Sequence, residues 1–306
     1  MSVHARALSS PRSDVLALGA AGVTLVLWSS AFVGIRAAGE DFSPGALALG
    51  RLTVAAVVLG LFAVARREPL PRPRDLPLIA LCGVLWLGAY SVLLNAAERR
   101  VDAGTAAMLV NVGPVLIALL AGWLLAEGFP RTLFAGCAIA FAGVAVIATS
   151  TSDGGGSRSS GVVLCLLAAV GYAGGVVTEK VVLRRVSAVQ TVFLACVTAA
   201  VACSWAAPSL VHEAGNAPVS SVGWVIYLGV FPTAVGFMTW AYALARTSAG
   251  RLASTTYLVP AIAILIGWIM LSETPPALAF LGGAVCLVGV AVARRPLRPE
   301  TQRAGP

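Results

Sequence analysis

Charged residues are scarce in this sequence of 306 residues. Asp, Glu, Lys and Arg make up 11% of the chain, and the mean hydropathy is +0.90. Soluble globular proteins carry about 25% charged residues. So small a polar complement cannot cover the surface of a water-soluble fold. We therefore expect an integral membrane protein whose main solvent is lipid.

Enzyme motifs are also missing. The sequence has no Walker A loop, no H-E-x-x-H and no G-x-S-x-G pattern, and its histidines, His4 and His212, lie in polar segments. The cysteines lie inside apolar runs without C-x-x-C spacing, which favours helix packing over a disulfide framework or a metal site. We therefore expect no enzyme, no cofactor and no metal. The six cysteines are Cys82, Cys137, Cys165, Cys196, Cys203 and Cys286.

Positive charge is in excess, with a net charge of +8 and a pI of about 9.7. No basic face or stripe of alternating basic and aromatic residues accompanies it, so we expect no nucleic-acid partner. The basic residues stand mostly between apolar runs, as the positive-inside rule describes. Lys180 is the only lysine, and the many Arg, Ala, Gly and Val residues are typical of a GC-rich bacterium.

Apolar runs long enough to cross a bilayer recur along the chain. A spanning helix needs about 20 apolar residues, and the breaks between these runs are too short for a soluble domain. The first run is too long for the core of a signal peptide and is read as a retained span. The ten predicted spans are 15–35, 45–65, 76–96, 103–125, 132–149, 161–182, 188–207, 222–243, 250–271 and 277–293.

The distribution of Arg and Lys predicts the orientation of these spans. With ten spans and a cytoplasmic N-terminus, sixteen basic residues fall on the cytoplasmic side and four, Arg36, Arg99, Arg100 and Arg158, fall on the other. This asymmetry indicates that both termini are cytoplasmic. We expect a bacterial plasma membrane.

An internal repeat appears when the sequence is shifted against itself so that Pro114 falls on Pro260. The shift superposes Pro, Glu and several Gly residues without a gap, which chance does not explain in so apolar a chain. Each half holds five spans, an odd number, so the second half enters the membrane from the opposite side, as in many secondary transporters. The matched pairs are Gly104/Gly250, Pro114/Pro260, Leu125/Leu271, Glu127/Glu273, Phe134/Phe280, Gly136/Gly282 and Gly143/Gly289.

The sequence therefore predicts an all-α membrane protein of ten transmembrane helices arranged as two inverted five-helix repeats. We place the first repeat at 15–149 and the second at 161–293, joined by a linker at 150–160. Cytoplasmic segments at 1–14 and 294–306, the latter a basic tail, flank the repeats.

Several motifs carry a resemblance to a known family. They are Trp28-Ser29-Ser30-Ala31-Phe32 in the first span, Arg51 in the second, and the segments Pro114 to Glu127 and Pro260 to Glu273. Over roughly residues 15–293 the chain resembles the EamA-type transporters of the drug/metabolite transporter superfamily. The resemblance implies a ten-helix fold around a central cavity. It also implies transport of small metabolites, often amino acids, by a secondary mechanism. Ala126 and Ser272 depart from the Gly that many relatives have before each Glu.

Two prolines and their neighbours are candidates for the moving parts. Pro114 and Pro260 sit in mid-span, where proline frees backbone groups and kinks a helix. Asn111 and Tyr257, three residues before the prolines, are related by the same shift and are our best pair for lining the pathway. Each of these four could instead serve packing or an interhelical hydrogen bond.

Arg51 lies about 9 Å inside its span by helical rise, where it could bind a carboxylate or hold an outer gate. Snorkelling to the interface, or a structural pairing with an acid, is the alternative. Further polar or aromatic positions could orient an amphipathic metabolite or stand in an interfacial belt. These positions are Trp28, Ser30, Tyr90, Asn95, Tyr172, Trp240 and Tyr242.

Acidic residues deep inside a span are not evident in the sequence. Glu127 and Glu273 fall at span ends, where they fix a loop, and Asp14 and Glu179 are also near ends. Coupling to a proton or another ion stays open, with little support for a buried carboxylate.

The pattern favours a secondary transporter that exports amino acids or related metabolites by alternating access. Two alternatives stay open. One is a flippase for a lipid-linked or amphipathic carrier, and the other is a membrane-embedded enzyme or assembly factor. The partners expected are a small-molecule substrate and the lipid bilayer; substrate, direction and oligomeric state do not follow from the residues.

Overall fold

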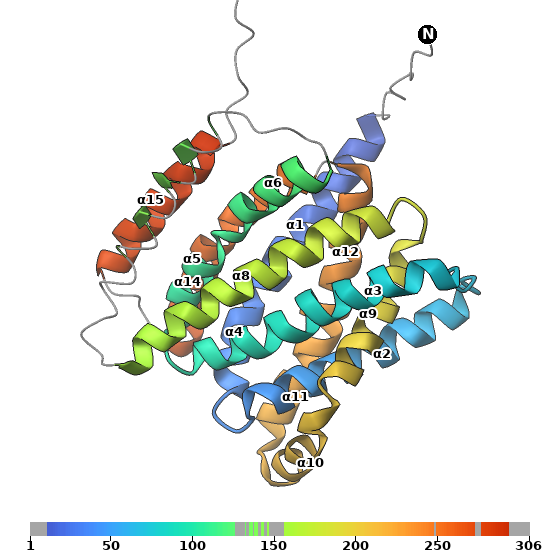
Figure 1. Cartoon of the computed structure of the whole chain (residues 1–306). Coiled ribbons are helices and arrows are strands. Elements are labelled where there is room, and N and C mark those ends of the chain that lie inside the picture. Colours follow the sequence, from blue (N-terminus) through green and yellow to red (C-terminus); the bar gives the residue numbers. More distant parts are fainter. Residues whose placement is uncertain are drawn as a thin grey trace, which may run out of the picture.

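The chain is described in a computed structural model over residues 11–125, 156–247, 249–272 and 277–293, with isolated helical residues between 132 and 146. The described part is helical throughout (Figure 1). Its helices are α1 (Pro11–Ala38), α2 (Pro44–Ala65), η1 (Pro73–Asp75), α3 (Leu76–Cys82), η2 (Gly83–Ala89), α4 (Tyr90–Glu98), α5 (Ala103–Val110), α6 (Gly113–Leu124), α8 (Gly156–Val182), α9 (Ala188–Ala202), η4 (Ser204–Ala206), α10 (Ala207–Asn216), α11 (Val219–Leu228), η5 (Gly229–Val235), α12 (Gly236–Arg246), α13 (Ala249–Ala253), η6 (Ser254–Tyr257), α14 (Leu258–Leu271) and α15 (Ala277–Ala293).

Six helices of the described part are long and apolar enough to cross a membrane, and a seventh counts if a bent pair is one span. That pair is Ala188–Ala202 with Ser204–Asn216, bent by 55°. The expected spans at 250–271 and 277–293 contain shorter apolar helices, Thr255–Leu271 and Phe280–Gly289. The expected span 132–149 lies mostly outside the described residues. The number ten therefore stays a prediction.

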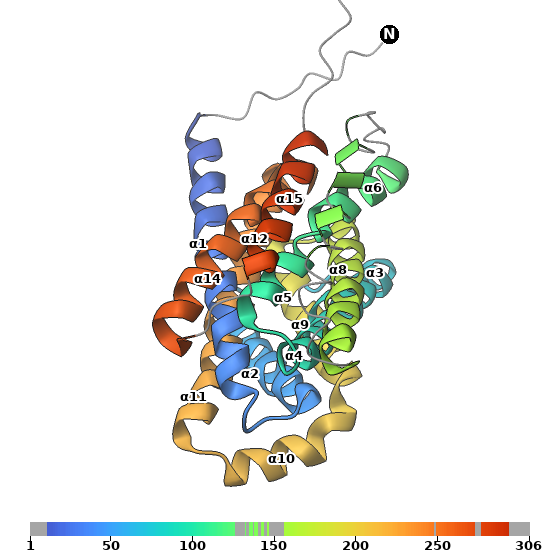
Figure 2. The same ribbon diagram turned by 90° about the vertical axis from the view of Figure 1, so that its left-hand side faces the viewer.

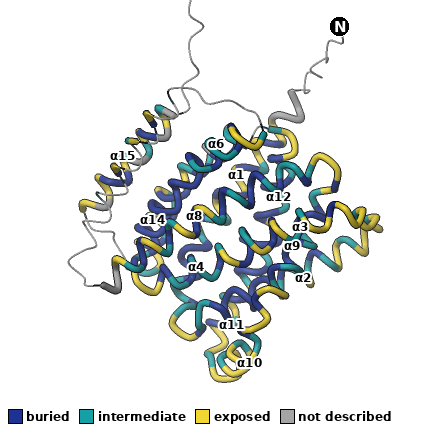
Figure 3. The backbone as a smooth tube through the Cα atoms, in the orientation of Figure 1, coloured by how far each residue is buried: buried dark blue, intermediate teal, exposed yellow. Residues whose placement is uncertain are grey.

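Large apolar side chains cover the outside of the helices. Leu61, Val64, Trp123, Trp268 and Ile269 are each more than half exposed. Figure 3 shows the buried residues along the inner faces of the helices and the exposed residues on their outer faces and on α10. An apolar exterior of this kind suits contact with lipid chains rather than water.

Two π-helical segments occupy equivalent places in the two halves. The shift that places Pro114 on Pro260 also places the first and last residues of η2 on the first and last residues of η5. The helices that follow, α4 and α12, begin with the same spacing, as do α5 and α13. The repeat detected in the sequence is therefore also a repeat of local structure.

Contacts between a helix of the first half and a helix of the second half have equivalents in which the two halves change places. α1 packs against α12 and α14, and α8 packs against the equivalent helices, α4 and α6. η5 contacts α2 as η2 contacts α9, and α2 and α9 contact each other. Figures 1 and 2 show the helices of the two halves interleaved in one body. Each half thus completes the packing of the other.

Glycine allows each π-helix to approach its partner closely. A Cβ on Gly83 would lie 2.4 Å from the carbonyl oxygen of Ala195 on α9. A Cβ on Gly229 would lie 2.8 Å from that of Arg51 on α2. Since a side chain cannot fit at either distance, glycine is what lets the π-helices lie against the central helices α2 and α9.

A glutamate from the other half binds the N-cap serine of each helix of the central pair, α2 and α9. Glu213 of α10 accepts hydrogen bonds from the backbone N–H and the hydroxyl of Ser43, the N-cap of α2, at 2.8 and 3.1 Å. Glu68, after α2, accepts one at 2.8 Å from Ser187, the N-cap of α9. A carboxylate at a helix N-terminus is favoured by the helix dipole.

Candidate functional site

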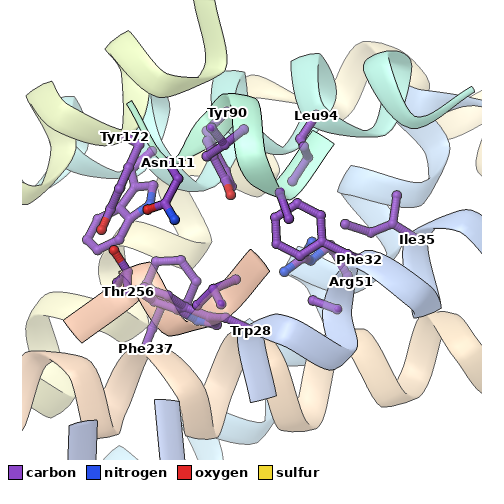
Figure 4. A pocket seen from close by; sticks show the side chains of 15 residues that line it. Trp28, Phe32, Ile35, Arg51, Tyr90, Leu94, Asn111, Tyr172, Phe237 and Thr256 are labelled. Carbon is purple, nitrogen blue, oxygen red and sulfur yellow. The ribbon is translucent and has the colours of Figure 1, made fainter. Parts of the chain in front are cut away.

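A central pocket lies between α1, α2, α5, α8, α12 and the helix break at η6, with walls from η2 and α4 (Figure 4). Its volume is about 60 Å³, whereas pockets that bind small molecules measure about 300–1,000 Å³. The helices must therefore separate before a metabolite fits. Its lining residues are Trp28, Ala31, Phe32, Ile35, Arg51, Trp86, Tyr90, Leu94, Ala107, Val110, Asn111, Tyr172, Phe237, Thr256 and Val259.

Arg51 supplies the charge of this pocket. Its side chain is 5% exposed, and its Nε donates to the hydroxyl of Thr233 at 3.0 Å. Thr233 in turn donates to the carbonyl of Leu228 at 2.7 Å, across the π-helix η5. No carboxylate of the described part lies within ion-pair distance of Arg51. Within the described part of the chain the guanidinium is thus a buried cation without a counter-ion, and such a group attracts an anion.

Aromatic rings form one wall of the pocket. The ring centre of Trp28 lies 5.8 Å from that of Trp86 and 5.3 Å from that of Phe237. Trp86 lies 5.3 Å from Tyr172. The indole of Trp28 donates to the carbonyl of Pro232 in η5 at 3.2 Å, which fixes its orientation. This wall offers an apolar and polarisable surface to an organic group.

Asn111 lies where the helical path breaks. α5 ends at Val110, and α6 starts at Gly113 with Pro114 in its first turn. The amide nitrogen of Asn111 is buried with no hydrogen-bond partner. Figure 4 shows Asn111, Tyr172 and Thr256 together at the end of the pocket opposite Arg51. An unsatisfied donor facing a cavity is a ready contact for a ligand acceptor.

The structure brings five of the ten predicted pathway residues to the pocket wall: Trp28, Arg51, Tyr90, Asn111 and Tyr172. The other five lie elsewhere. Trp240 is fully buried behind the wall, 4.8 Å from Trp28 between ring centres. The predicted partner of Asn111, Tyr257, is half-buried at the end of η6, while its neighbour Thr256 lines the pocket.

Three more predicted residues make contacts away from the pocket. Ser30 is hydrogen-bonded to the hydroxyl of Tyr227 at 2.6 Å. Tyr242 packs its ring under the guanidinium of Arg246 at 3.5 Å. Asn95 donates to the carbonyl of Pro44 at 3.0 Å. It lines a separate cavity of about 220 Å³ that shares Ile35 with the central pocket and contains Arg36, Gly39, Glu40, Glu98 and Arg99.

The structure describes both predicted prolines but neither of the paired glutamates. Pro114 stands at the start of α6, and Pro260 is the third residue of α14, after the 3-10 segment η6. Both prolines thus follow a break between helices rather than kink a continuous one. Glu127 and Glu273 lie outside the described residues.

Sequence reasoning missed several residues of the site. Trp86, Phe237 and Thr256 line the pocket, and Thr233 holds Arg51. Trp86 and Phe237 stand within apolar runs, where an aromatic residue facing the pocket looks like one facing lipid. The repeat pointed to Tyr257 as the counterpart of Asn111, whereas Thr256, directly before it, lines the pocket.

The arrangement suits the binding of a small molecule. Within the described part, no group of three or more His, Cys, Asp or Glu residues could hold a metal ion. A lone cation, an aromatic wall and an amide instead complement a small molecule with a carboxylate and an apolar body.

Comparison with known proteins reveals relatives that cover most of the chain. The EamA-like transporter family matches residues 15–149 and 159–295. A probable terminal-alkyne amino-acid exporter of Streptantibioticus cattleyicolor is 39% identical over 273 residues, which cover 89% of this chain and 91% of the relative. An uncharacterized transporter of Bacillus subtilis is 34% identical over 264 residues, 86% of each chain. A crystal structure with 20% identity shares the fold, with a TM-score of 0.66 over 94% of this chain and 98% of the other.

Proposed function

Since the chain belongs to the EamA-like transporter family, we propose that it exports small organic metabolites, amino acids or related compounds, from the cell. It is a multi-pass membrane transporter of the plasma membrane. The observation that carries the proposal is the buried Arg51 guanidinium, which faces an aromatic pocket and has no carboxylate of the described residues within ion-pair distance. Export is supported by the relative that is named as an amino-acid exporter.

The pocket favours a substrate with a carboxylate and an uncharged, apolar side chain. The carboxylate would bind the guanidinium of Arg51, since Arg matches carboxylate geometry with two parallel donors. The side chain would lie against Trp28, Trp86 and Phe237, and Asn111 would donate to a further acceptor. Among the described lining residues Arg51 is the only charged one, so a charged side chain on the substrate would have no partner of opposite sign, and the α-ammonium group of an amino acid would have to bind neutral oxygen acceptors of the pocket.

Alternating access between two inverted repeats is the mechanism we propose. Its support is the exchange symmetry of the packing, in which α1 with α12 and α14 matches α8 with α4 and α6. α1 and α8 also start at opposite ends of the molecule in Figure 1. The helix breaks before Pro114 and Pro260 stand at the pocket and offer places where the halves could bend.

We propose that the end of the molecule bearing Arg66, Arg67 and Lys180 is cytoplasmic. Lys180 donates to the carbonyls of Leu244 and Thr247, and Arg185 lies 3.7 Å from Asp75, so these loops share one end. That end is rich in Arg and Lys, as the positive-inside rule describes for the cytoplasmic side. A cysteine-free variant carrying Ser2→Cys should react with a membrane-impermeant maleimide only in inverted vesicles; labelling of intact cells contradicts this orientation.

A matched pair of substrates tests the site. Purified protein in liposomes should take up leucine faster than leucinamide, which lacks the carboxylate, and Arg51→Gln should abolish this preference. The control is Arg246→Gln, which removes an exposed guanidinium far from the pocket. Leucine is the first member of a panel of apolar amino acids and their amides. Absence of flux for the whole panel, or an unchanged preference in Arg51→Gln, contradicts the proposal.

A flippase is the second candidate function, and a large apolar cavity beside the central pocket supports it. An apolar space of about 340 Å³ lies between α5, α14 and α15 and meets the central pocket at Asn111. A carrier with a lipid tail could place its tail there and its head in the pocket. Scrambling of a fluorescent lipid-linked carrier by the reconstituted protein, without amino-acid flux, would favour this function.

A further inference from the structure

Glu179 is a buried acid that the central pocket does not use. It lies on α8, one turn from the helix end, and its side chain is 2% exposed. Its Oε2 is buried and makes no hydrogen bond. The sequence placed this residue near a span end, as the structure does, and expected no acid buried deep in the bundle. The second expectation is wrong, because the surrounding helices leave only 2% of Glu179 exposed.

Among the described residues, the groups around Glu179 supply no counter-charge. The indole of Trp240 from α12 lies beside it. The thiols of Cys82 from α3 and Cys196 from α9, and the hydroxyl of Tyr172 two turns away on α8, lie within the range of its electrostatic interactions. The elements α5, α6 and η2, which also pack on α8, carry no titratable group, and Tyr90 and Glu98 of α4 are not among the groups that act on Glu179. The side chain of Arg251 on α13 lies outside the described residues.

The only lysine of the chain binds other groups. Lys180, the next residue, directs its ammonium to the carbonyls of Leu244 and Thr247 at 2.6 Å each. No cation of the described part lies within ion-pair distance of Glu179. An ionised carboxylate would be very costly in such surroundings, and a carboxyl group escapes this cost by taking up a proton.

A proton is the cation that this site suits. Metal cations need several oxygen, nitrogen or sulfur ligands, and the described residues offer no group of three acids, histidines or cysteines. A single carboxyl group is sufficient to bind one proton.

Glu179 is also connected to the central pocket. Tyr172, Val176 and Glu179 follow one another at helical spacing on a buried face of α8, and Tyr172 lines the pocket. On the other side, Trp240 is the neighbour of Glu179 and packs against Trp28 with 4.8 Å between ring centres. Ionisation of Glu179 would require water or further donors in addition to the indole of Trp240, and therefore a displacement of Trp240 or α8.

We propose that Glu179 is a proton-binding site whose occupancy is coupled to the central pocket through Trp240 and Tyr172. The carboxylate takes a proton from water on one side of the membrane, and the same proton leaves to water on the other side after the halves have rearranged. This goes beyond the proposed export function, because it names the ion that would drive it.

Proton binding can be measured without a substrate. Infrared difference spectra of the protein in lipid should show a protonated carboxyl band that disappears as the pH is raised, and Glu179→Gln should lack it. Tryptophan fluorescence should change over the same pH range in the wild type and stay constant in Glu179→Gln. The control is Glu40→Gln, which removes an exposed carboxylate and should leave both signals unchanged. A wild type without the band, or a band or fluorescence change that persists in Glu179→Gln, overturns the proposal.

Flux measurements then test the coupling. In liposomes with an acidic lumen, the wild type should accumulate leucine, and Glu179→Gln should lose about tenfold or more of this accumulation while leucine–leucine exchange stays within about twofold. Glu179→Asp keeps a titratable group and should restore part of the leucine accumulation. Its activity also serves as a control that substitution at this position leaves the protein folded. Equal accumulation by wild type and Glu179→Gln overturns the coupling. Absence of all flux in the wild type contradicts the export function, while the spectra decide the proton site independently.

Discussion

Arg51 and Trp28 owe their positions to groups that a π-helix makes available. The widened turn of η5 lets Thr233 donate to Leu228, five residues back, and leave its own oxygen free to accept from Arg51. The carbonyl of Pro232 accepts from the indole of Trp28. π-helical turns are rare and occur often at functional sites. Here one such turn orients both the cation and an aromatic ring of the pocket.

Thr233→Val should weaken substrate binding without removing the charge. The variant takes away the acceptor of Arg51, and a net hydrogen bond contributes about 1 kcal/mol, so half-saturation of leucine uptake should rise about fivefold. Thr53→Val is the matched control, because Thr53 lies on the same helix as Arg51 and bonds only to the carbonyl of Leu49. Equal values for both variants would refute this role of Thr233.

Asn111→Ala and Tyr257→Phe should behave differently, although the repeat relates the two positions. Asn111 lines the pocket with an unsatisfied amide nitrogen, whereas Tyr257 does not line it. We expect the thermal stabilisation of the protein by leucine to fall markedly in Asn111→Ala and to change little in Tyr257→Phe. Both variants should keep their melting temperature without ligand within a few degrees. A larger loss in Tyr257→Phe would favour the symmetric prediction from the sequence.

At the scale of elements, the π-helices and the central helices form two equivalent contacts. Gly83 of η2 lies against α9, and Gly229 of η5 lies against α2. In lipid the hydrophobic effect does not drive helices together. Helices of membrane proteins therefore associate through close packing, which small residues at the contact allow. Each contact sets the register between a π-helix and its partner helix, and η5 in turn positions Arg51 and Trp28.

Gly83→Ala should destabilise the protein, since the new Cβ would lie 2.4 Å from the carbonyl oxygen of Ala195 and α9 would have to move. We expect a fall in melting temperature of several degrees, in line with overpacking costs of about 1–3 kcal/mol. Gly223→Ala is the control: Gly223 is an exposed glycine of α11 with no atom within 4 Å of the added Cβ. Its melting temperature should hold or rise slightly, because alanine favours helix. A tolerated Gly83→Ala would show that η2 can slide along α9.

At the scale of the whole molecule, the two halves hold each other at both ends. Glu213 of the second half caps α2 of the first, and Glu68 of the first half binds the cap of α9 in the second. A glutamate thus joins the halves at each end, and the pocket between them has a volume of only about 60 Å³. Alternating access would open one of these contacts at a time.

Glu213→Gln should favour opening at the end where α2 begins. Loss of the carboxylate weakens the charge-assisted bonds to Ser43, each of which contributes about 1.5–3 kcal/mol. Spin labels at the exposed positions Glu40 and Ser220 should then show a broader, longer distance distribution. Glu68→Gln, at the other end, is the matched control and should not lengthen this distance. Identical distributions for the two variants would argue against separate opening of the ends.

The class of protein, the family and the duplication follow from the sequence without coordinates. Composition, the spacing of Pro114 and Pro260, and the ordered motifs are properties of the chain alone, and the structure repeats the spacing in η2 and η5. Which side chains meet was settled by tertiary packing. It brought Trp86, Phe237 and Thr256 into the pocket, left Ser30 and Tyr242 outside it, and buried Glu179.

The physical reason lies in the solvent. In water, an apolar stripe tells which face of a helix is buried. In lipid, both the outward and the inward faces of a helix are apolar, so the sequence pattern does not tell which face is buried. Only the packing of the helices places Trp86 in the pocket and leaves Trp123 exposed to lipid.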